Sequence, residues 1–191
     1  TNYYDYRLRD MGYCCGCFGY NYTAWSNWLL RKDVLEALHV CGHAGDKAFS
    51  DCAGGCVGMP SFRHNDRSSG FDFSGALGRA LASGVGVTFY YGEQDTACNS
   101  VGARTMVKHL DFPGASDFAA APLEQFSVAG ATAGLVQSAA GLTWIQIGGA
   151  GHMSPADNPA AAFLALESLL EPSRLRSAVE GNRTLSFLAK V

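Results

Sequence analysis

Val85-Gly-Val-Thr-Phe-Tyr-Tyr91 is the stretch of sequence that decides the fold class. It is short, β-branched and aromatic, with little polar alternation, which is typical of a strand buried on both faces of a sheet. A second stretch of this kind, Leu142-Thr-Trp-Ile-Gln-Ile147, comes later in the chain. Helical patterns precede, separate and follow the two strands, so the sequence predicts an α/β fold.

Several weaker elements surround these two strands. Helices are predicted over 30–39, 75–82, about 100–110 and a closing segment from Pro159, and weak strands are predicted at 125–129 and 135–139. Ser74 is a suitable N-cap for the second of these helices, and Gly84 is placed to end it. Asn99 or Ser100 can cap the third. The closing helix is expected to bury one apolar stripe, made of Phe163, Leu166, Leu169 and Leu170.

The composition is that of a globular protein with one sizeable core. Hydrophobic residues make up 48% of the 191 residues and charged residues 16%, with a formal net charge of −3. These values exclude a disordered or strongly basic protein. Lys and Arg are scattered without a basic stripe, so nucleic acid is not an expected partner. Gly, Ser or a charge interrupts every apolar run, and no membrane span is predicted.

Polar, glycine-rich segments follow both strong strands. Gly92-Glu-Gln-Asp-Thr-Ala-Cys-Asn99 comes after the first, and Gly148-Gly-Ala-Gly-His-Met-Ser-Pro155 after the second. Taken singly, Asp95 is an Asx-turn candidate and His152 a surface-loop histidine. Taken together they have the order of the last two members of a Ser–Asp–His triad, at strand ends where α/β proteins gather functional groups. No G-x-S-x-G nucleophile elbow occurs in the sequence, so the chain carries half of an active site.

Four segments stand out as motifs: Asn2-Tyr-Tyr-Asp-Tyr-Arg7, Asp33-Val-Leu-Glu-Ala-Leu-His-Val40, Tyr90-Tyr-Gly-Glu-Gln-Asp-Thr-Ala-Cys-Asn99 and Gly149-Ala-Gly-His-Met-Ser-Pro155. In this order and spacing they resemble the serine carboxypeptidase family, which includes lysosomal cathepsin A and the vacuolar carboxypeptidases of plants and yeast. The resemblance extends over roughly residues 2–170. It implies the C-terminal part of an α/β-hydrolase fold with a disulfide-rich loop and helix insertion.

Several members of this family are cut into a larger N-terminal chain and a smaller C-terminal chain that stay together. A start at Thr1, without an initiator Met or a signal segment, suits such a C-terminal chain. The resemblance then implies a serine-type carboxypeptidase that hydrolyses C-terminal residues of peptides through an acyl-enzyme. Its nucleophilic Ser would lie on the N-terminal chain of the same precursor. A homodimer of the two-chain unit is an open alternative, and no cofactor is expected.

The resemblance also assigns roles to single residues. His152 is the candidate general base that takes the proton of the Ser hydroxyl, and Asp95 holds the imidazole tautomer. Cys98, Met153 and Glu93 are the candidates for lining the substrate pocket. Two alternatives stay open, because fold does not fix function. One is an inactive scaffold subunit in which Asp95 and His152 are relics, and the other is an acyltransferase or hydroxynitrile lyase.

Residues 1–70 are expected to form a cysteine-rich insertion on the cap side, and residues 71–191 the C-terminal part of the hydrolase core with both triad members. The disulfide candidates are Cys14, Cys15, Cys17, Cys41, Cys52 and Cys56. With Cys98 the total is seven, so at least one thiol is free or bonded outside this chain. A zinc site around Cys52-x-x-x-Cys56 is the weaker alternative, and no metal is expected.

Two tripeptides, Asn21-Tyr-Thr23 and Asn182-Arg-Thr184, match the acceptor pattern for N-glycosylation. Glycosylation and disulfides both belong to oxidising compartments. The sequence therefore favours a protein of the lysosome or vacuole, or a secreted one.

Overall fold

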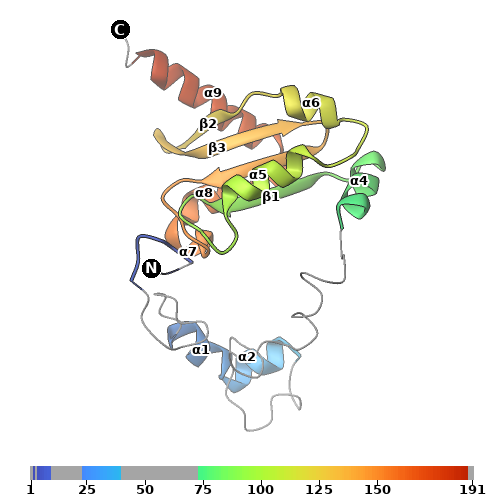
Figure 1. Ribbon diagram of the computed structural model, residues 1–191. Helices are drawn as coiled ribbons and strands as arrows, with labels where there is room; N and C mark the ends of the chain where they lie inside the picture. Colours follow the sequence, from blue (N-terminus) through green and yellow to red (C-terminus); the bar gives the residue numbers. More distant parts are fainter. Residues whose placement is uncertain (1, 3, 10–22, 40–72, 189–191) are drawn as a thin grey trace. The chain divides into compact units, whose positions relative to one another are not determined.

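The computed structural model describes residues 2, 4–9, 23–39 and 73–188 (Figure 1). The chain divides into two compact units, Thr1–Asn2 with Leu8–Phe71 and Tyr3–Arg7 with Asp72–Val191. The six disulfide candidates and Asn21 lie outside the described residues. Their pairing, the glycosylation of Asn21 and the role of the first 70 residues as an insertion therefore stay predictions.

The described part of the first unit contains two short helices, α1 (Thr23–Leu29) and α2 (Lys32–Ala37). The sequence predicts a single helix over 30–39. The backbone is extended at Arg31, with ψ 137°, so α2 begins only after that residue. Val34 is the buried apolar residue of α2.

The second unit is built on a mixed sheet with the strand order β1-β4-β3-β2. Its strands are β1 (Val87–Gly92), β2 (Glu124–Val128), β3 (Ala131–Ala139) and β4 (Leu142–Ile147). All four coincide with predicted strands, although β3 begins earlier. β1 and β4 run parallel, while β4–β3 and β3–β2 are antiparallel hairpins. The register pairs Val87 with Leu142 and Gly92 with Ile147, so the two parallel strands end side by side.

Helices cover both faces of this sheet (Figure 1). They are α4 (Ser74–Ala82), α5 (Ser100–Lys108) and α6 (Ala115–Ala120) on one face, and α8 (Pro159–Leu170) and α9 (Ser173–Leu188) on the other. Successive side chains of a strand point to opposite faces, so Trp144 and Ile145 of β4 belong to different cores. The predicted α/β layering is therefore confirmed. In the described part of the chain, no helix combines the length and apolar character needed to cross a membrane.

Two of the predicted helix starts are confirmed by side-chain caps. Asn99 Oδ1 accepts a hydrogen bond from Gly102 N at 2.7 Å, and α5 follows. Asn158 Oδ1 accepts one from Ala161 N at 3.2 Å, and α8 follows. Ser74 is the first residue of α4 and does not cap it. The sequence analysis does not predict α6, α9 or the single turn α7 (Ser154–Asp157).

β1 is not the strand buried on both faces that the sequence predicts. Among the described residues it pairs on one side only, with β4, and forms the edge of the sheet. Tyr90 in its centre is 51% exposed, whereas Leu142, Ile145 and Ile147 of β4 are fully buried. The prediction is wrong for β1 in this structure because a strand becomes fully buried only with a neighbour on each side and cover on both faces.

α8 buries a different face from the predicted one. Its buried residues are Ala161, Ala165 and Ser168. The predicted stripe is exposed, with exposed fractions of 60% for Phe163, 57% for Leu166, 54% for Leu169 and 88% for Leu170. Small side chains let the helix approach the sheet closely, and the large apolar side chains then point away from it. The result is an uncovered apolar surface along α8.

The glycosylation prediction at Asn182 disagrees with the structure. Asn182 is 6% exposed and lies in α9. Its Oδ1 accepts hydrogen bonds from Ser127 Oγ at 2.5 Å and Thr132 Oγ1 at 3.3 Å, which join α9 to β2 and β3. A glycan can be attached only to an amide that faces solvent. The buried amide of Asn182 therefore does not fit a glycosylation site, although the tripeptide matches the acceptor pattern.

Candidate active site

Asp95 lies just beyond the end of β1 and is held there by its own loop. Its Oδ1 accepts hydrogen bonds from the backbone N–H groups of Ala97 at 2.8 Å and Cys98 at 3.0 Å. These contacts form an Asx-type turn. They use only one carboxylate oxygen and fix the direction of the other. The side chain is 3% exposed.

His152 lies just beyond the end of β4, in the loop that leads into α7. The loop is held by a hydrogen bond from Gly151 N to Asp157 Oδ2 at 2.7 Å and by one from Ser154 Oγ to Gly151 O at 3.0 Å. The His152 side chain is 30% exposed, so one side of the ring is open to a reacting partner.

The two predicted triad residues meet. His152 Nδ1 lies 2.8 Å from Asp95 Oδ2. An ionised carboxylate only accepts hydrogen bonds, so Nδ1 carries the proton and Nε2 presents its lone pair. Within the described residues, Nε2 has no hydrogen-bond partner. An imidazole arranged in this way is suited to accept a proton from a hydroxyl placed against Nε2.

Backbone contacts tie the loops after β1 and β4 together. Glu93 N donates to Ile147 O at 3.0 Å, and Gln94 N donates to Ala150 O at 2.8 Å. Gly92 makes this approach possible, because a Cβ at that position would lie 2.0 Å from Gly151 O.

Glu93, predicted as a pocket residue, joins the same two loops. Its Oε2 accepts hydrogen bonds from Gly149 N at 3.0 Å and from Gln94 Nε2 at 2.8 Å. These contacts hold the His152 loop against the Asp95 loop. Contact of Glu93 with a substrate stays a prediction.

Cys98 borders the Asp95–His152 pair. The possible ligand atoms of the three side chains lie within 4.8 Å of one another. Cys98 is exposed and has no disulfide partner among the described residues. Burial around its sulfur, and secondly the charge of Asp95, raise the pKa of its thiol, which disfavours the thiolate that a metal requires. Both Asp95 oxygens already accept hydrogen bonds, so the arrangement suits proton transfer better than metal binding. Met153 is half-buried and directly follows His152.

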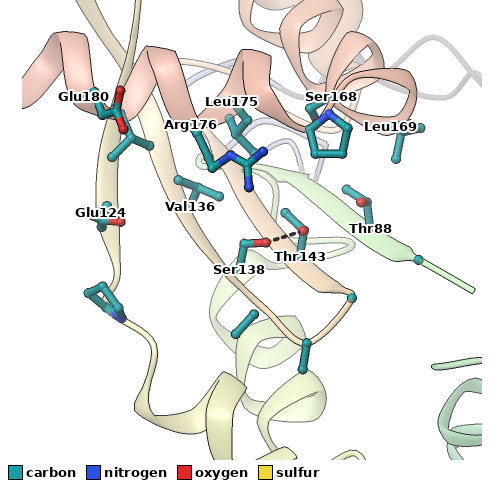
Figure 2. Close-up of a pocket in the computed structure, with 17 residues that line it drawn as sticks. Thr88, Glu124, Val136, Ser138, Thr143, Ser168, Leu169, Leu175, Arg176 and Glu180 are labelled. Carbon is teal, nitrogen blue, oxygen red and sulfur yellow. Dashed lines mark hydrogen bonds between the residues drawn. The ribbon is translucent and has the colours of Figure 1, made fainter. Parts of the chain in front are cut away.

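A cavity of about 900 Å³ lies away from this pair (Figure 2). Its lining includes Gly86, Thr88, Ser138 and Thr143 at the opposite end of the sheet, and Arg176 of α9 points toward the Ser138–Thr143 hydroxyl pair. A strand rises roughly 3.3 Å per residue, so the length of β1 separates the cavity from the Asp95 loop by about 16 Å. The cavity is therefore no part of the candidate active site.

Tyr4 is a site residue that the motif analysis leaves without a role. Its ring stacks on the His152 imidazole, with centroids 4.2 Å apart and planes at 23°. The sequence signal was the motif Asn2–Arg7, which resembles a family segment. Only the fold shows that the Tyr4–Arg7 part of this motif lies at the strand ends.

Comparisons with known proteins agree with the family resemblance of the sequence motifs. The family model described as "Serine carboxypeptidase" matches residues 5–172. The pheromone-processing carboxypeptidase kex1 of Penicillium rubens is 32% identical over 173 residues, which cover 83% of this chain and 26% of that protein. Serine carboxypeptidase-like 48 of Arabidopsis thaliana is 30% identical over 171 residues, 90% of this chain and 31% of that protein. Serine carboxypeptidase 3 of Hordeum vulgare is 30% identical over 190 residues, 98% of this chain and 35% of that protein.

One solved structure shows the fold. The crystal structure of Kex1(delta)p, a prohormone-processing carboxypeptidase from Saccharomyces cerevisiae, matches with a TM-score of 0.55 and 20% identity, over 88% of this chain and 34% of that one. The mixed sheet is thus a part of the α/β-hydrolase fold. The chain spans about a quarter to a third of the length of the curated relatives named above. Because the family match extends from Asp5 to Pro172 and takes in both strand ends, the chain belongs to the serine carboxypeptidase family.

Proposed function

We propose that this chain supplies the Asp and the His of the catalytic triad of a serine-type carboxypeptidase, whose nucleophilic Ser lies on an N-terminal chain of the same precursor. The single observation that supports the proposal is the 2.8 Å contact between His152 Nδ1 and Asp95 Oδ2 at the ends of two paired parallel strands. In a triad, the third member is a hydroxyl placed against the free Nε2.

In the acylation step, the Ser oxygen attacks the carbonyl carbon of the last peptide bond while its proton moves to His152 Nε2. The imidazolium that forms is stabilised by Asp95, which stays ionised. The C–N bond then breaks, the proton passes from Nε2 to the departing amine, and the peptide remains bound to Ser as an ester.

In the deacylation step, water gives a proton to Nε2 and its oxygen attacks the ester carbon. The Ser–carbonyl bond breaks, Ser recovers the proton, and the shortened peptide leaves with a new carboxylate. Cys98 and Met153 are proposed to line the pocket at the imidazole, since one borders the pair and the other directly follows His152.

The Ser-bearing chain is proposed to cover the outer edge of β1 and the apolar surface of α8. β1 is a parallel strand, and parallel strands are usually buried on both sides. A second cavity, of about 360 Å³, separates β1 from α8 and is lined by Tyr90, Pro155, Phe163 and Leu166. Covering it would remove a contiguous apolar patch from water. The protein is proposed to act in the lysosome or vacuole, or outside the cell, which the cysteine-rich segment favours.

The test is hydrolysis of a blocked dipeptide with a free C-terminal carboxylate by the complete native protein. We expect His152→Ala to reduce kcat by about 10⁴-fold or more with little change in KM, because the remaining triad residues cannot act alone. Asp95→Asn should reduce kcat by a comparable or somewhat smaller factor, because it favours the wrong imidazole tautomer.

Matched controls are His109→Ala and Asp111→Asn, which change exposed residues of the same types. They should leave kcat within about twofold, since surface changes of this kind are usually small. Equal hydrolysis by wild type and His152→Ala would show the triad assignment to be wrong. If the wild type does not hydrolyse the dipeptide but transfers an acyl group or cleaves a hydroxynitrile, the acyltransferase or the lyase is favoured. If it shows none of these three activities, the inactive scaffold is favoured.

A further inference from the structure

The segment Tyr4–Arg7 is bonded to both loops of the candidate active site. His152 N donates a hydrogen bond to Tyr4 O at 2.7 Å, and Tyr6 N donates one to Gln94 O at 3.2 Å. The segment is thus joined directly to the loop that carries His152 and to the loop that carries Asp95. A displacement of the segment would move both loops.

An ion pair between the buried Asp5 carboxylate and the partly exposed Arg7 side chain anchors this segment. Asp5 is 1% exposed and accepts hydrogen bonds from the Nε and terminal guanidinium N–H of Arg7, and from the Arg7 backbone N–H. The Arg7 hydrogen bonds hold the pKa of Asp5 below its usual value, so the carboxylate is ionised across the neutral range. The anchor lies against Gly151, where a Cβ would be 2.5 Å from Tyr4 O and 2.7 Å from Asp5 Cβ.

The anchored segment places the Tyr4 ring on the face of the imidazole. The centroids are 4.2 Å apart and the planes differ by 23°. The hydrogen bond from Nδ1 to Asp95 fixes one edge of the imidazole but permits the ring to tilt about that bond. A stacked aromatic ring opposes this tilt, and its negative face attracts a cation.

We propose that Tyr4 is a positioning residue for His152: its ring holds the imidazole in the plane that directs Nε2 to the nucleophile, and it stabilises the imidazolium. The proposal rests on the function proposed above and adds a residue outside the triad to it. Asp5 and Arg7 act through Tyr4, because they fix the backbone that carries the ring. The part of Tyr4 that acts is the ring face, not the hydroxyl.

The first experiment does not depend on catalysis. The His152 ring protons are titrated by NMR in the complete native protein, in Tyr4→Leu and in Tyr4→Phe. Removal of a ring stacked on the imidazolium should lower the titration midpoint of His152 by about half a pH unit, and Phe should preserve the midpoint. The charged groups and the thiol on the loops and segment around His152 include Glu93, Asp95, Cys98, Asp5, Arg7 and Asp157, and none of them is changed by these substitutions.

The second experiment measures kcat and KM for the blocked dipeptide. Tyr4→Leu should reduce kcat by about tenfold with KM little changed, and Tyr4→Phe should stay within about twofold, because a misdirected base weakens chemistry and not binding. Tyr6→Leu is the matched control, since Tyr6 is an exposed ring of the same segment, and it should have no effect. If the wild type hydrolyses nothing, but Tyr4→Leu still lowers the titration midpoint of His152, the proposed carboxypeptidase function is rejected and the stacking role of Tyr4 is kept.

Three results would overturn the proposal. The first is an unchanged midpoint together with an unchanged kcat in Tyr4→Leu. The second is a rise in KM at constant kcat, which would make Tyr4 a substrate contact. The third result can be obtained even if Tyr4→Leu does not fold, because it is measured on the wild type. It is the absence of NMR cross-relaxation between the Tyr4 and His152 rings, which a centroid distance of 4.2 Å requires.

Discussion

Gly92 is the residue that lets the two loops of the candidate active site approach each other, and Gly151 lets the Tyr4–Arg7 segment pack against the His152 loop. Any Cβ at Gly92 would lie 2.0 Å from Gly151 O and 2.5 Å from Ala150 O, and these are backbone atoms that cannot rotate away. The Asp95–His152 contact therefore depends on the absence of a side chain at Gly92, a residue that has no proposed role in the chemistry.

We expect Gly92→Ala to lower the free energy of unfolding by about 1 to 3 kcal/mol, as overpacking does. It should reduce kcat by about 10²-fold, because a displacement of about 1 Å weakens the hydrogen bond by which Asp95 orients His152. Urea unfolding and peptide hydrolysis measure the two effects. Gly181→Ala is the matched control: this helical glycine of α9 has open space around it, so Ala should stabilise by about 0.5 to 1 kcal/mol. Full activity in Gly92→Ala would contradict the steric argument.

The sequence allows Asp95 and His152 to be predicted, because strand ends are recognisable from local patterns. Their contact follows from the parallel pairing of β1 and β4, and the structure has the same geometry. Tyr4 could not be assigned in this way, since its place beside His152 depends on the chain returning over a long sequence separation. The bond from Gly149 N to Glu93 Oε2 could not be predicted for the same reason, because the two residues lie on different loops.

At the scale of elements, two helix starts, those of α5 and α8, could be predicted because a side-chain cap is a local feature. Asn99 and Asn158 each bond to the backbone three residues later. The buried face of α8 was not readable. Its sequence is apolar around most of the helix, with Ala and Leu on different sides, so periodicity alone does not say which side meets the sheet.

The two Asn caps allow a matched prediction. Asn99→Ala should cost about 0.5 to 2 kcal/mol of unfolding free energy, the ordinary value of a cap. Asn158→Ala should cost about 0.5 to 1.5 kcal/mol more, because its Nδ2 also donates to Gly148 O at 3.0 Å and holds the His152 loop. Urea denaturation measures both. Asn158→Ser should restore the cap and not the second bond, and equal losses in the two Ala variants would show that the Gly148 contact contributes nothing.

At the scale of the whole molecule, the most unusual surface is the apolar one along α8 beside the edge strand β1. A soluble protein rarely leaves such a contiguous patch in water. The described residues include a buried core on each face of the sheet and still expose Phe163, Leu166, Leu169 and Leu170. This surface is the part of the fold that the proposed partner chain would complete.

We expect Leu166→Lys to weaken binding of the Ser-bearing chain by at least tenfold, since burying a Leu side chain contributes about 1.5 to 3 kcal/mol. The same substitution should reduce self-association of the 191-residue chain alone. Sedimentation velocity over a concentration series measures both. The control is Val101→Lys, which changes an exposed apolar residue of α5 on the other face of the sheet. An α8 variant that assembles as tightly as the wild type would exclude this surface as the interface.

The parallel pairing of β1 and β4 also bears on how this protein could change in evolution. The register from Val87–Leu142 to Gly92–Ile147 brings the loops of Asp95 and His152 to the same end of the sheet. The exposed turn at Ala129–Gly130, with φ values of 50° and 81°, joins β2 and β3, which lie beyond β4 from β1. Extra residues inserted there lengthen a surface loop at small entropic cost. New loops, and the recognition surfaces they carry, can therefore be gained at that edge while Asp95 and His152 keep their spacing.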